Sequence, residues 1–299
     1  MTDSFAPLRP LVFSIAYRML GSVAEAEDIA QEALLRAHRE AAAGTEIASP
    51  KAYITSIATR LAIDHLRLAR VRRETYVGPW LPEPLLVDEG ADVAHAVEVA
   101  DSLSMAFLVL LERLAPVERA VFLLREVFDY DFAEVAEVVG KTEDNCRQIL
   151  VRARRRVADE RPRFEASRAE RDALAERFFA AAQDGDVDGL VALLASDATF
   201  TGDGGGKATA FPRPIDGGLP VARVVAAIFR RGRALGMRAE PAQVNGQPGL
   251  LARDADGAIV SAMALDVAGG VVLGVRSVVN PDKLGHLGPV SDAARKPPR

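Results

Sequence analysis

The chain has 299 residues, of which 49% are hydrophobic and 26% are charged, values that are ordinary for globular proteins and predict two or three domains. The net charge is -5, so any nucleic-acid-binding surface has to come from a local cluster of basic residues. The single cysteine, Cys146, excludes a disulfide framework and a cysteine-based zinc site within one chain, and no two of the four histidines have the spacing of metal ligands. We therefore expect neither a metal nor another cofactor.

The first residues lack the basic segment and following apolar segment of a secretory signal, and no stretch approaches the roughly 18 apolar residues of a membrane span. These features favour a cytoplasmic, reducing location without membrane contact.

Residues 1–75 are expected to form helices. An apolar stripe at helical spacing stops at Gly21, and Ser22 is followed three positions later by Glu25, the spacing of a capping box. That second helix should run to about Ala42. Serine and proline at 49 and 50 open a third helix that ends in a run of arginines, because proline fits the first helical turn.

Residues 76–95 are expected to form a linker. Prolines at 79, 82 and 84 exclude a helix interior. The segment also holds the only tryptophan, Trp80. A large amphipathic side chain on a stiff segment makes a good docking anchor, because little entropy is lost on ordering it.

Residues 96–162 are expected to be helical again and to contain a helix-turn-helix. A short apolar helix over 132–139, a turn at Gly140 and a polar-faced helix from Thr142 give its two elements. Apolar residues at spacings of three and four should face inward, and these are Cys146, Ile149, Leu150, Ala153 and Val157. The outer face can then enter the major groove, where arginine reads guanine and glutamine or asparagine reads adenine. The alternative is a solvated basic helix end.

Residues 166–287 are expected to form an α+β domain, followed by a disordered tail over 288–299. Two helices come first, and glycine-rich strand signals follow. We expect a helix over 221–235 and a curved antiparallel sheet made from 200–206, 237–244, 249–253, 259–267 and 271–279.

The two helical parts together resemble an extracytoplasmic-function sigma factor, with residues 11–73 similar to region two and 114–156 similar to region four. The stretch from Ala26 to Arg36 is similar to that family's polymerase-binding helix. The resemblance implies core RNA polymerase and promoter DNA as partners. It places Asp28, Gln31, Glu32 and Arg36 against polymerase. It places Arg60, Asp64, His65, Arg67 and Arg70 at the −10 element, and Thr142, Asn145, Arg147, Gln148, Val151, Arg152 and Arg155 at the −35 element.

The tail resembles a SnoaL-like domain, the cone-shaped fold shared with nuclear transport factor two. Three segments are similar to those of one sigma subgroup with such a tail: Trp80-Leu81-Pro82-Glu83-Pro84, Asp203-Gly204-Gly205-Gly206-Lys207 and Asn280-Pro281-Asp282-Lys283-Leu284. The resemblance implies that the tail packs against the linker and region two. There it would regulate the sigma factor in cis, in place of a separate anti-sigma protein.

Two alternatives remain open. Cone folds often enclose a pocket, so the tail could sense a ligand or catalyse a reaction, with Asp203 and Asp266 as the carboxylates near predicted strands. However, most strand positions expected to face inward are apolar, namely Phe200, Val260, Ala262, Ala264, Val272 and Val275, so we do not expect an enzyme. The second alternative is a helix-turn-helix repressor, which would bind a palindromic site as a dimer.

Overall fold

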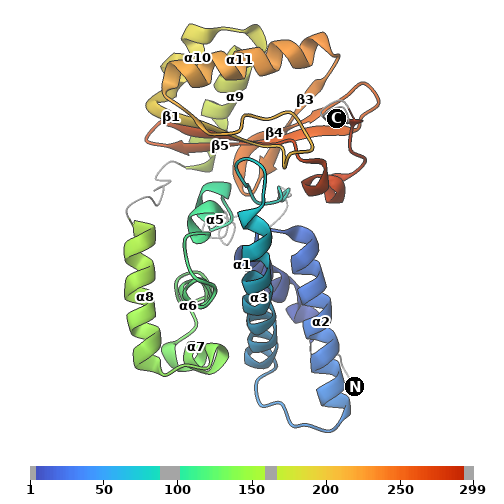
Figure 1. Ribbon diagram of the computed structural model, residues 1–299, viewed down its shortest axis with the longest axis vertical. Helices are drawn as coiled ribbons and strands as arrows, with labels where there is room; N and C mark the ends of the chain where they lie inside the picture. Colours follow the sequence, from blue (N-terminus) through green and yellow to red (C-terminus); the bar gives the residue numbers. More distant parts are fainter. Residues whose placement is uncertain (1–4, 88–101, 159–166, 293–299) are drawn as a thin grey trace. The chain divides into compact units, whose positions relative to one another are not determined.

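The computed structural model describes residues 5–87, 102–158 and 167–292 (Figure 1). The chain forms two compact units that do not follow its order. The helical unit consists of Met1–Thr75 and Leu108–Arg161. The mixed unit consists of Tyr76–Phe107 and Pro162–Arg299, so the expected linker clusters with the C-terminal residues. None of the described helices is both long enough and apolar enough to cross a membrane.

The first part of the helical unit has the expected helix boundaries. Gly21 ends the first long helix in the left-handed conformation at φ 67°, and the Ser22 hydroxyl accepts a hydrogen bond from the Glu25 N–H at 3.3 Å. The Ser49 hydroxyl accepts from the Ala52 N–H in the same way. The elements are η1 (Ala6–Leu8), α1 (Arg9–Leu20), α2 (Val23–Ala42) and α3 (Pro50–Glu74).

The second helical part contains the expected helix-turn-helix. Asp131 and Glu134 form a capping box at the start of its first helix, and Gly140 turns the chain at φ 64°. The elements are α5 (Met105–Leu111), α6 (Pro116–Glu126), α7 (Phe132–Val139) and α8 (Glu143–Ala158).

A buried arginine joins the two helical parts within this unit. Arg119 of α6 is 3% exposed, and its guanidinium donates to the Met19 carbonyl of α1 at 2.5 Å and to the Glu112 carboxylate at 2.7 Å. Burial lowers the pKa of Arg119 to about 9, because the charged form loses its hydration.

The mixed unit is a six-stranded sheet in the order β2-β1-β6-β5-β4-β3, and Figure 1 shows its helices on one face of the sheet. β1 runs parallel to β6, whereas the remaining pairs are antiparallel, so the expectation of a fully antiparallel sheet was wrong at this pair. The elements are α9 (Arg168–Asp184), α10 (Val187–Leu193), β1 (Leu194–Asp203), β2 (Ile215–Asp216), α11 (Gly218–Ala234), β3 (Arg238–Val244), β4 (Gln247–Arg253), β5 (Ile259–Ala268) and β6 (Val271–Val278).

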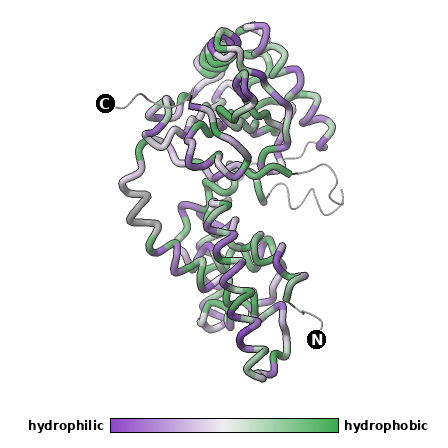
Figure 2. The backbone as a smooth tube through the Cα atoms, turned by 90° about the vertical axis from the view of Figure 1, so that its right-hand side faces the viewer, coloured by the Kyte–Doolittle hydropathy of each residue, from purple (hydrophilic) through white to green (hydrophobic). Residues whose placement is uncertain are grey.

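The core of the mixed unit lies between these helices and the sheet. Phe178 of α9, Leu190 of α10 and Val225 of α11 are fully buried against Leu265 and Val275 of the sheet. Figure 2 shows hydrophobic and hydrophilic residues alternating in short runs along the chain, as expected of elements that bury one face.

The last described segment completes this unit. Two short 3-10 helices follow β6, namely η2 (Pro281–Lys283) and η3 (Gly285–Leu287). The chain then pairs with β5, because the Ile259 N–H donates to the Pro289 carbonyl at 2.8 Å and the Ser291 N–H donates to the Ile259 carbonyl at 2.9 Å. The ordered domain therefore continues past its expected end at residue 287. The last part of the expected disordered tail, residues 293–299, lies outside the described residues.

Candidate functional site

The inner face of α8 is the one expected from its apolar spacing. Cys146, Ile149, Leu150, Ala153 and Val157 are all buried, none of them more than 6% exposed. Burial also raises the pKa of the Cys146 thiol, which makes it a poor nucleophile and favours a core role.

The outer face of α8 carries the expected DNA-reading residues. Thr142 caps the helix by accepting a hydrogen bond from the Asn145 N–H at 3.3 Å. Val151 is 48% exposed, and the polar side chains around it are exposed as well, namely Asn145, Arg147, Gln148, Arg152 and Arg155. This face therefore combines donors, acceptors and one methyl-bearing side chain, the groups that read base edges.

Arginines of α8 divide into two kinds. Arg154 pairs with Glu126 at 2.7 Å and Arg156 pairs with Glu118, so these two brace α8 against α6. Arg147 pairs with Glu143 at 2.7 Å and Asp144 at 2.9 Å in its own first turn. Exposed pairs of this kind are worth less than about 1 kcal/mol, so Arg147 can exchange its partners for a phosphate or a base at little cost.

The helix expected at the −10 element, α3, packs against α7 of the helix-turn-helix. Arg60 donates to the Val138 carbonyl at 3.0 Å and to the Glu137 carbonyl at 2.9 Å, which caps the end of α7. The Thr55 and Tyr130 hydroxyls are hydrogen-bonded at 2.8 Å. The family resemblance placed Arg60 at the −10 element, and nothing in the sequence indicated this intramolecular contact.

Further along α3, the other expected −10 residues are more accessible. Asp64 and Arg67 are exposed and form an ion pair at 2.9 Å. The His65 ring lies 3.6 Å from the Glu25 carboxylate of α2. Arg70 belongs to the same helix, but its side chain lies outside the described residues.

The expected polymerase-binding residues share one face of α2. Asp28, Gln31 and Arg36 are exposed, and Arg36 pairs with the half-buried Glu32 at 2.6 Å. Leu35 lies among them and is 42% exposed, a residue that the sequence reasoning did not single out.

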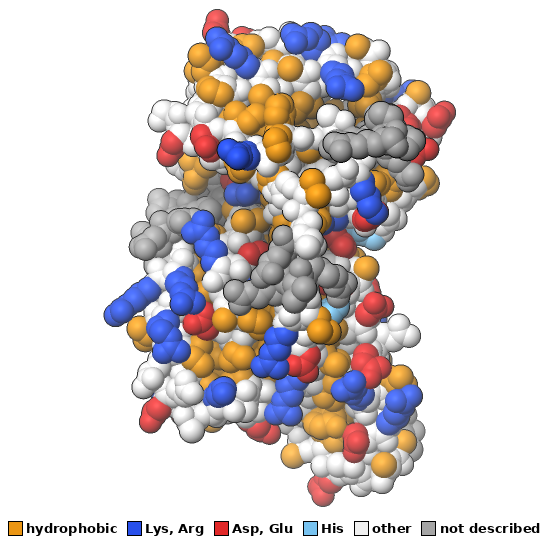
Figure 3. Space-filling model, in the orientation of Figure 1, with side chains coloured by type: hydrophobic (Ala, Val, Ile, Leu, Met, Phe, Trp, Pro, Cys, Tyr) orange, Lys and Arg blue, Asp and Glu red, His pale blue; other side chains and the backbone are white. Residues whose placement is uncertain are grey.

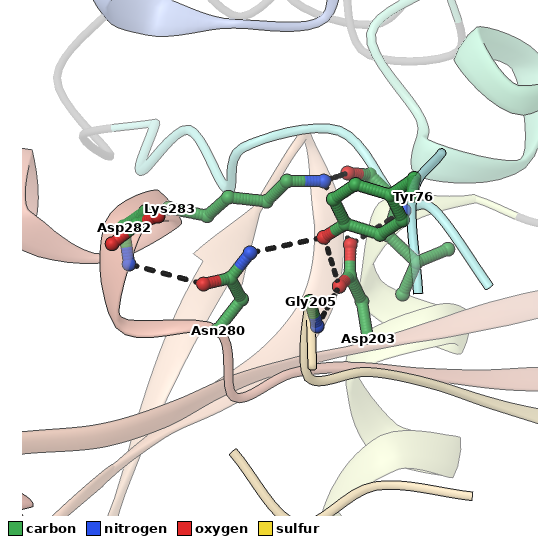
Figure 4. A network of polar contacts seen from close by, with 7 residues as sticks. Tyr76, Asp203, Gly205, Asn280, Asp282 and Lys283 are labelled. Atoms are coloured by element: carbon green, nitrogen blue, oxygen red, sulfur yellow. Dashed lines mark hydrogen bonds and ion pairs between the residues drawn. The ribbon is translucent and has the colours of Figure 1, made fainter. Parts of the chain in front are cut away.

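In the mixed unit, the three motif segments meet at Asp203, which is completely buried (Figure 4). One carboxylate oxygen of Asp203 accepts from the Leu81 N–H at 2.8 Å and from the Lys283 ammonium at 2.7 Å. The other accepts from the Tyr76 hydroxyl at 2.5 Å and the Gly205 N–H at 3.0 Å. Four donors, one of them a cation, compensate for the burial of this charge.

Lys283 is the cation of this cluster, and it is only 7% exposed. Besides Asp203, its ammonium donates to the Leu81 carbonyl at 2.5 Å. It lies 4.4 Å from the centre of the Trp80 ring and 4.9 Å from that of Tyr76, close enough for cation–π attraction to both. Lys283 therefore contacts the linker at the backbone carbonyl of Leu81 and at the aromatic rings of Trp80 and Tyr76.

Asn280 and the glycines complete the cluster. The Asn280 amide donates to the Tyr76 hydroxyl at 2.9 Å, and its oxygen accepts from the Asp282 N–H at 3.1 Å. A Cβ at Gly205 would lie 2.2 Å from the Asn280 amide nitrogen, and the φ of Gly205 is +54°, so glycine is required there. Burial and the hydrogen bond to Asp203 raise the pKa of the Tyr76 hydroxyl far above its ordinary value.

Two residues that sequence reasoning missed also hold the linker. Tyr76 stands just before the motif, and a tyrosine in a linker carries no signal of its partner. Asn245 is fully buried at φ 55°; its side chain accepts from the Leu85 N–H at 2.9 Å and donates to the Leu103 carbonyl at 3.0 Å. The outer pair of the cluster, Lys207 with Asp282, is exposed on both sides.

The carboxylates proposed for catalysis lie elsewhere than in the large cavity of this unit, which is lined by α11 and one face of the sheet. Asp203 holds the linker, and Asp266 pairs with Arg276 at 2.7 Å while burial raises the pKa of Asp266. Ala262 and Ala264, expected to face inward, do not line the cavity, whereas Met263 between them does. Phe200 and Val260 line the cavity as expected, so the expected orientation was wrong at Ala262 and Ala264 of β5.

Comparisons with known proteins agree with this architecture. The Sigma-70 region 2 family matches residues 5–72, and the Sigma-70, region 4 family matches residues 104–157. The chain is 39% identical over 291 residues to the ECF RNA polymerase sigma factor SigJ of Mycobacterium tuberculosis, covering 94% of this chain and 92% of SigJ. It is 30% identical to the probable ECF RNA polymerase sigma factor SigI of the same species, covering 93% of each chain.

Helical units with a helix-turn-helix and these two regions define a sigma-70-type transcription factor. The chain belongs to the extracytoplasmic-function sigma factors, which direct transcription. The crystal structure of the Mycobacterium tuberculosis sigma factor SigJ is similar over the whole fold, with a TM-score of 0.76 and 37% identity, covering 97% of this chain and 100% of SigJ. The expected order of two helical regions followed by an α+β domain is thus confirmed.

Proposed function

We propose that this sigma factor binds core RNA polymerase through the exposed face of α2, reads the −35 element with α8 and the −10 element with α3, and is regulated in cis by its mixed unit. The observation that carries the regulatory part is the buried cluster at Asp203. It attaches the linker between the two sigma regions to the C-terminal domain.

Support for the reading helix comes from its charge and its exposure. Gln148, Val151 and Arg152 are exposed in the first two thirds of α8 and suit base edges, whereas Arg155 is exposed nearer its C-terminal end and suits a phosphate contact. Phosphate contacts release counterions, so affinity for promoter DNA should fall steeply with salt.

The packing of α3 on α7 supports a further step before promoter binding. The −35 and −10 elements lie about 25 base pairs apart. That separation is roughly 85 Å along a DNA duplex that rises 34–36 Å per turn. A helix of 25 residues such as α3 is only about 37 Å long. While Arg60 bonds the end of α7, α3 and α8 are too close together to read both elements at once. The two regions therefore have to separate on the polymerase.

The linker determines how far they separate, and this is where the mixed unit acts. Trp80 and Leu81 contact the C-terminal domain at Asp203 and Lys283, and the linker extends further only if that contact opens. The chain thus carries its own restraint, and we propose that no separate anti-sigma protein is needed for it.

Transcription in vitro tests the proposal. Core polymerase is combined with the full chain, with a chain stopped after Arg161, or with one stopped before Asn280, on a pool of promoter sequences. Specific initiation by any version supports the sigma role, and different yields or promoter choices among the three support regulation in cis. Equal initiation by all three would contradict regulation by the tail. Binding of duplex DNA alone, without binding of core polymerase, would instead indicate a repressor.

A further inference from the structure

The mixed unit holds a cavity that neither the sigma regions nor the motif cluster uses. Its volume is about 980 Å³, at the upper end of the range of small-molecule sites. It lies between α11 and the face of the sheet formed by β1, β3, β4, β5 and β6.

The interior of the cavity is apolar with two hydroxyls. Phe200, Leu250 and Met263 are each no more than 4% exposed and form an apolar surface. Ser261 and Ser277 are 9% and 5% exposed and add two hydroxyl groups to the lining. A hydroxyl can both donate and accept a hydrogen bond, so these two can fix a polar group of a guest molecule.

The mouth of the cavity is basic. Arg223 and Arg231 are two helical turns apart on α11, on the side that lines the cavity, and both are exposed. Arg233 and Arg238 also line it, whereas Asp184 is the one carboxylate among its described lining residues. In Figure 3, hydrophobic side chains gather on the face of this unit, with Lys and Arg side chains beside them.

We propose that this cavity binds an amphipathic organic anion of the fatty-acid type. The apolar body would fill the space between α11 and the sheet, and the carboxylate would lie at Arg223 and Arg231, whose planar guanidinium groups match it. The lining offers no buried titratable side chain for acid–base chemistry, which favours binding over catalysis. This inference is independent of the proposed regulation by the linker.

Fluorescence of anilinonaphthalene sulfonate, an apolar anionic probe, tests the proposal on the full chain. Decanoate should displace the probe, whereas decanol and decyltrimethylammonium should displace it at least about tenfold less well, as expected when a hydrogen bond to a charged group is lost. Equal displacement by all three compounds would overturn the assignment of an anion site.

Matched variants locate the site. Ala227→Phe fills the cavity from α11 and should abolish decanoate binding, while Ala234→Phe at the exposed end of the same helix should not. Arg231→Gln should weaken decanoate binding about tenfold, and Arg230→Gln, exposed but outside the lining, should leave it unchanged. Thermal unfolding followed by circular dichroism checks that each variant is folded. If the paired variants bind decanoate equally, the cavity is not its site.

Discussion

Replacing Lys283 by methionine tests whether the buried cluster holds the linker. Methionine has a similar length and no charge, so Lys283→Met leaves the Asp203 carboxylate buried without its cation. Removing one partner of a buried ion pair costs about 3–5 kcal/mol. Three donors to Asp203 remain, from Tyr76, Leu81 and Gly205, so we expect the low end, about 3 kcal/mol.

Urea denaturation followed by tryptophan fluorescence measures the loss of unfolding free energy at the docked linker. Trp80 is the only tryptophan of the chain, and the Lys283 ammonium lies 4.4 Å from its ring, so its fluorescence reports the docked linker. With a slope of about 2 kcal/mol per molar urea, the midpoint should fall by roughly 1.5 M.

The matched control is Lys207→Met. Lys207 also pairs with an aspartate of the cluster, but it and Asp282 are more than half exposed. Such a pair contributes less than about 1 kcal/mol, so its midpoint should move by less than roughly 0.5 M. If the two variants shifted the midpoint equally, or if Lys283→Met left it unchanged, the buried pair would not hold the linker.

Three further outcomes follow from the structure. Tyr76→Phe should destabilise the docked linker by about 2 kcal/mol near neutral pH. Since the folded state raises the pKa of Tyr76, its contribution is complete below the ordinary value of 10.0 and is lost as the pH rises above it, so urea midpoints of the variant and the natural chain should converge there. Arg152→Ala should reduce use of the −35 element and lower the salt dependence of promoter binding, whereas Arg154→Ala, which breaks a pair with α6, should change folding stability only slightly; equal promoter defects would contradict the assignment. Thr55→Val leaves the buried Tyr130 hydroxyl without its partner and should loosen α3 from α7 by about 1 kcal/mol, seen as faster amide exchange in α7; unchanged exchange would argue against this contact as a restraint.

Local signals in the sequence predicted most of the elements. Gly21 and Gly140 end helices because they adopt positive φ angles, and Ser22 and Ser49 begin them with side-chain caps, so each boundary depends on neighbouring residues alone. The inner face of α8 followed from its apolar spacing in the same way.

Long-range features could not be read from the sequence. The parallel pairing of β1 with β6 and the register that turns Met263 toward the cavity depend on which strands meet across the whole domain. The partner of Arg60 is a pair of backbone carbonyls, which any residue type would present. The three motif segments were identified by resemblance, but their meeting at one buried carboxylate required the fold.

The position of Lys283 in the chain also has a consequence for synthesis on the ribosome. Lys283 lies 202 residues after Leu81, whose carbonyl it contacts. Translation at about 5–20 residues per second leaves roughly 10–40 seconds between the appearance of the two. Region four ends near residue 157, so both sigma regions are complete only in the later part of that interval, while the Leu81 carbonyl still lacks its contact with Lys283. A nascent chain thus passes through a period in which both sigma regions have been made but the contacts of Lys283 with the linker have not yet formed.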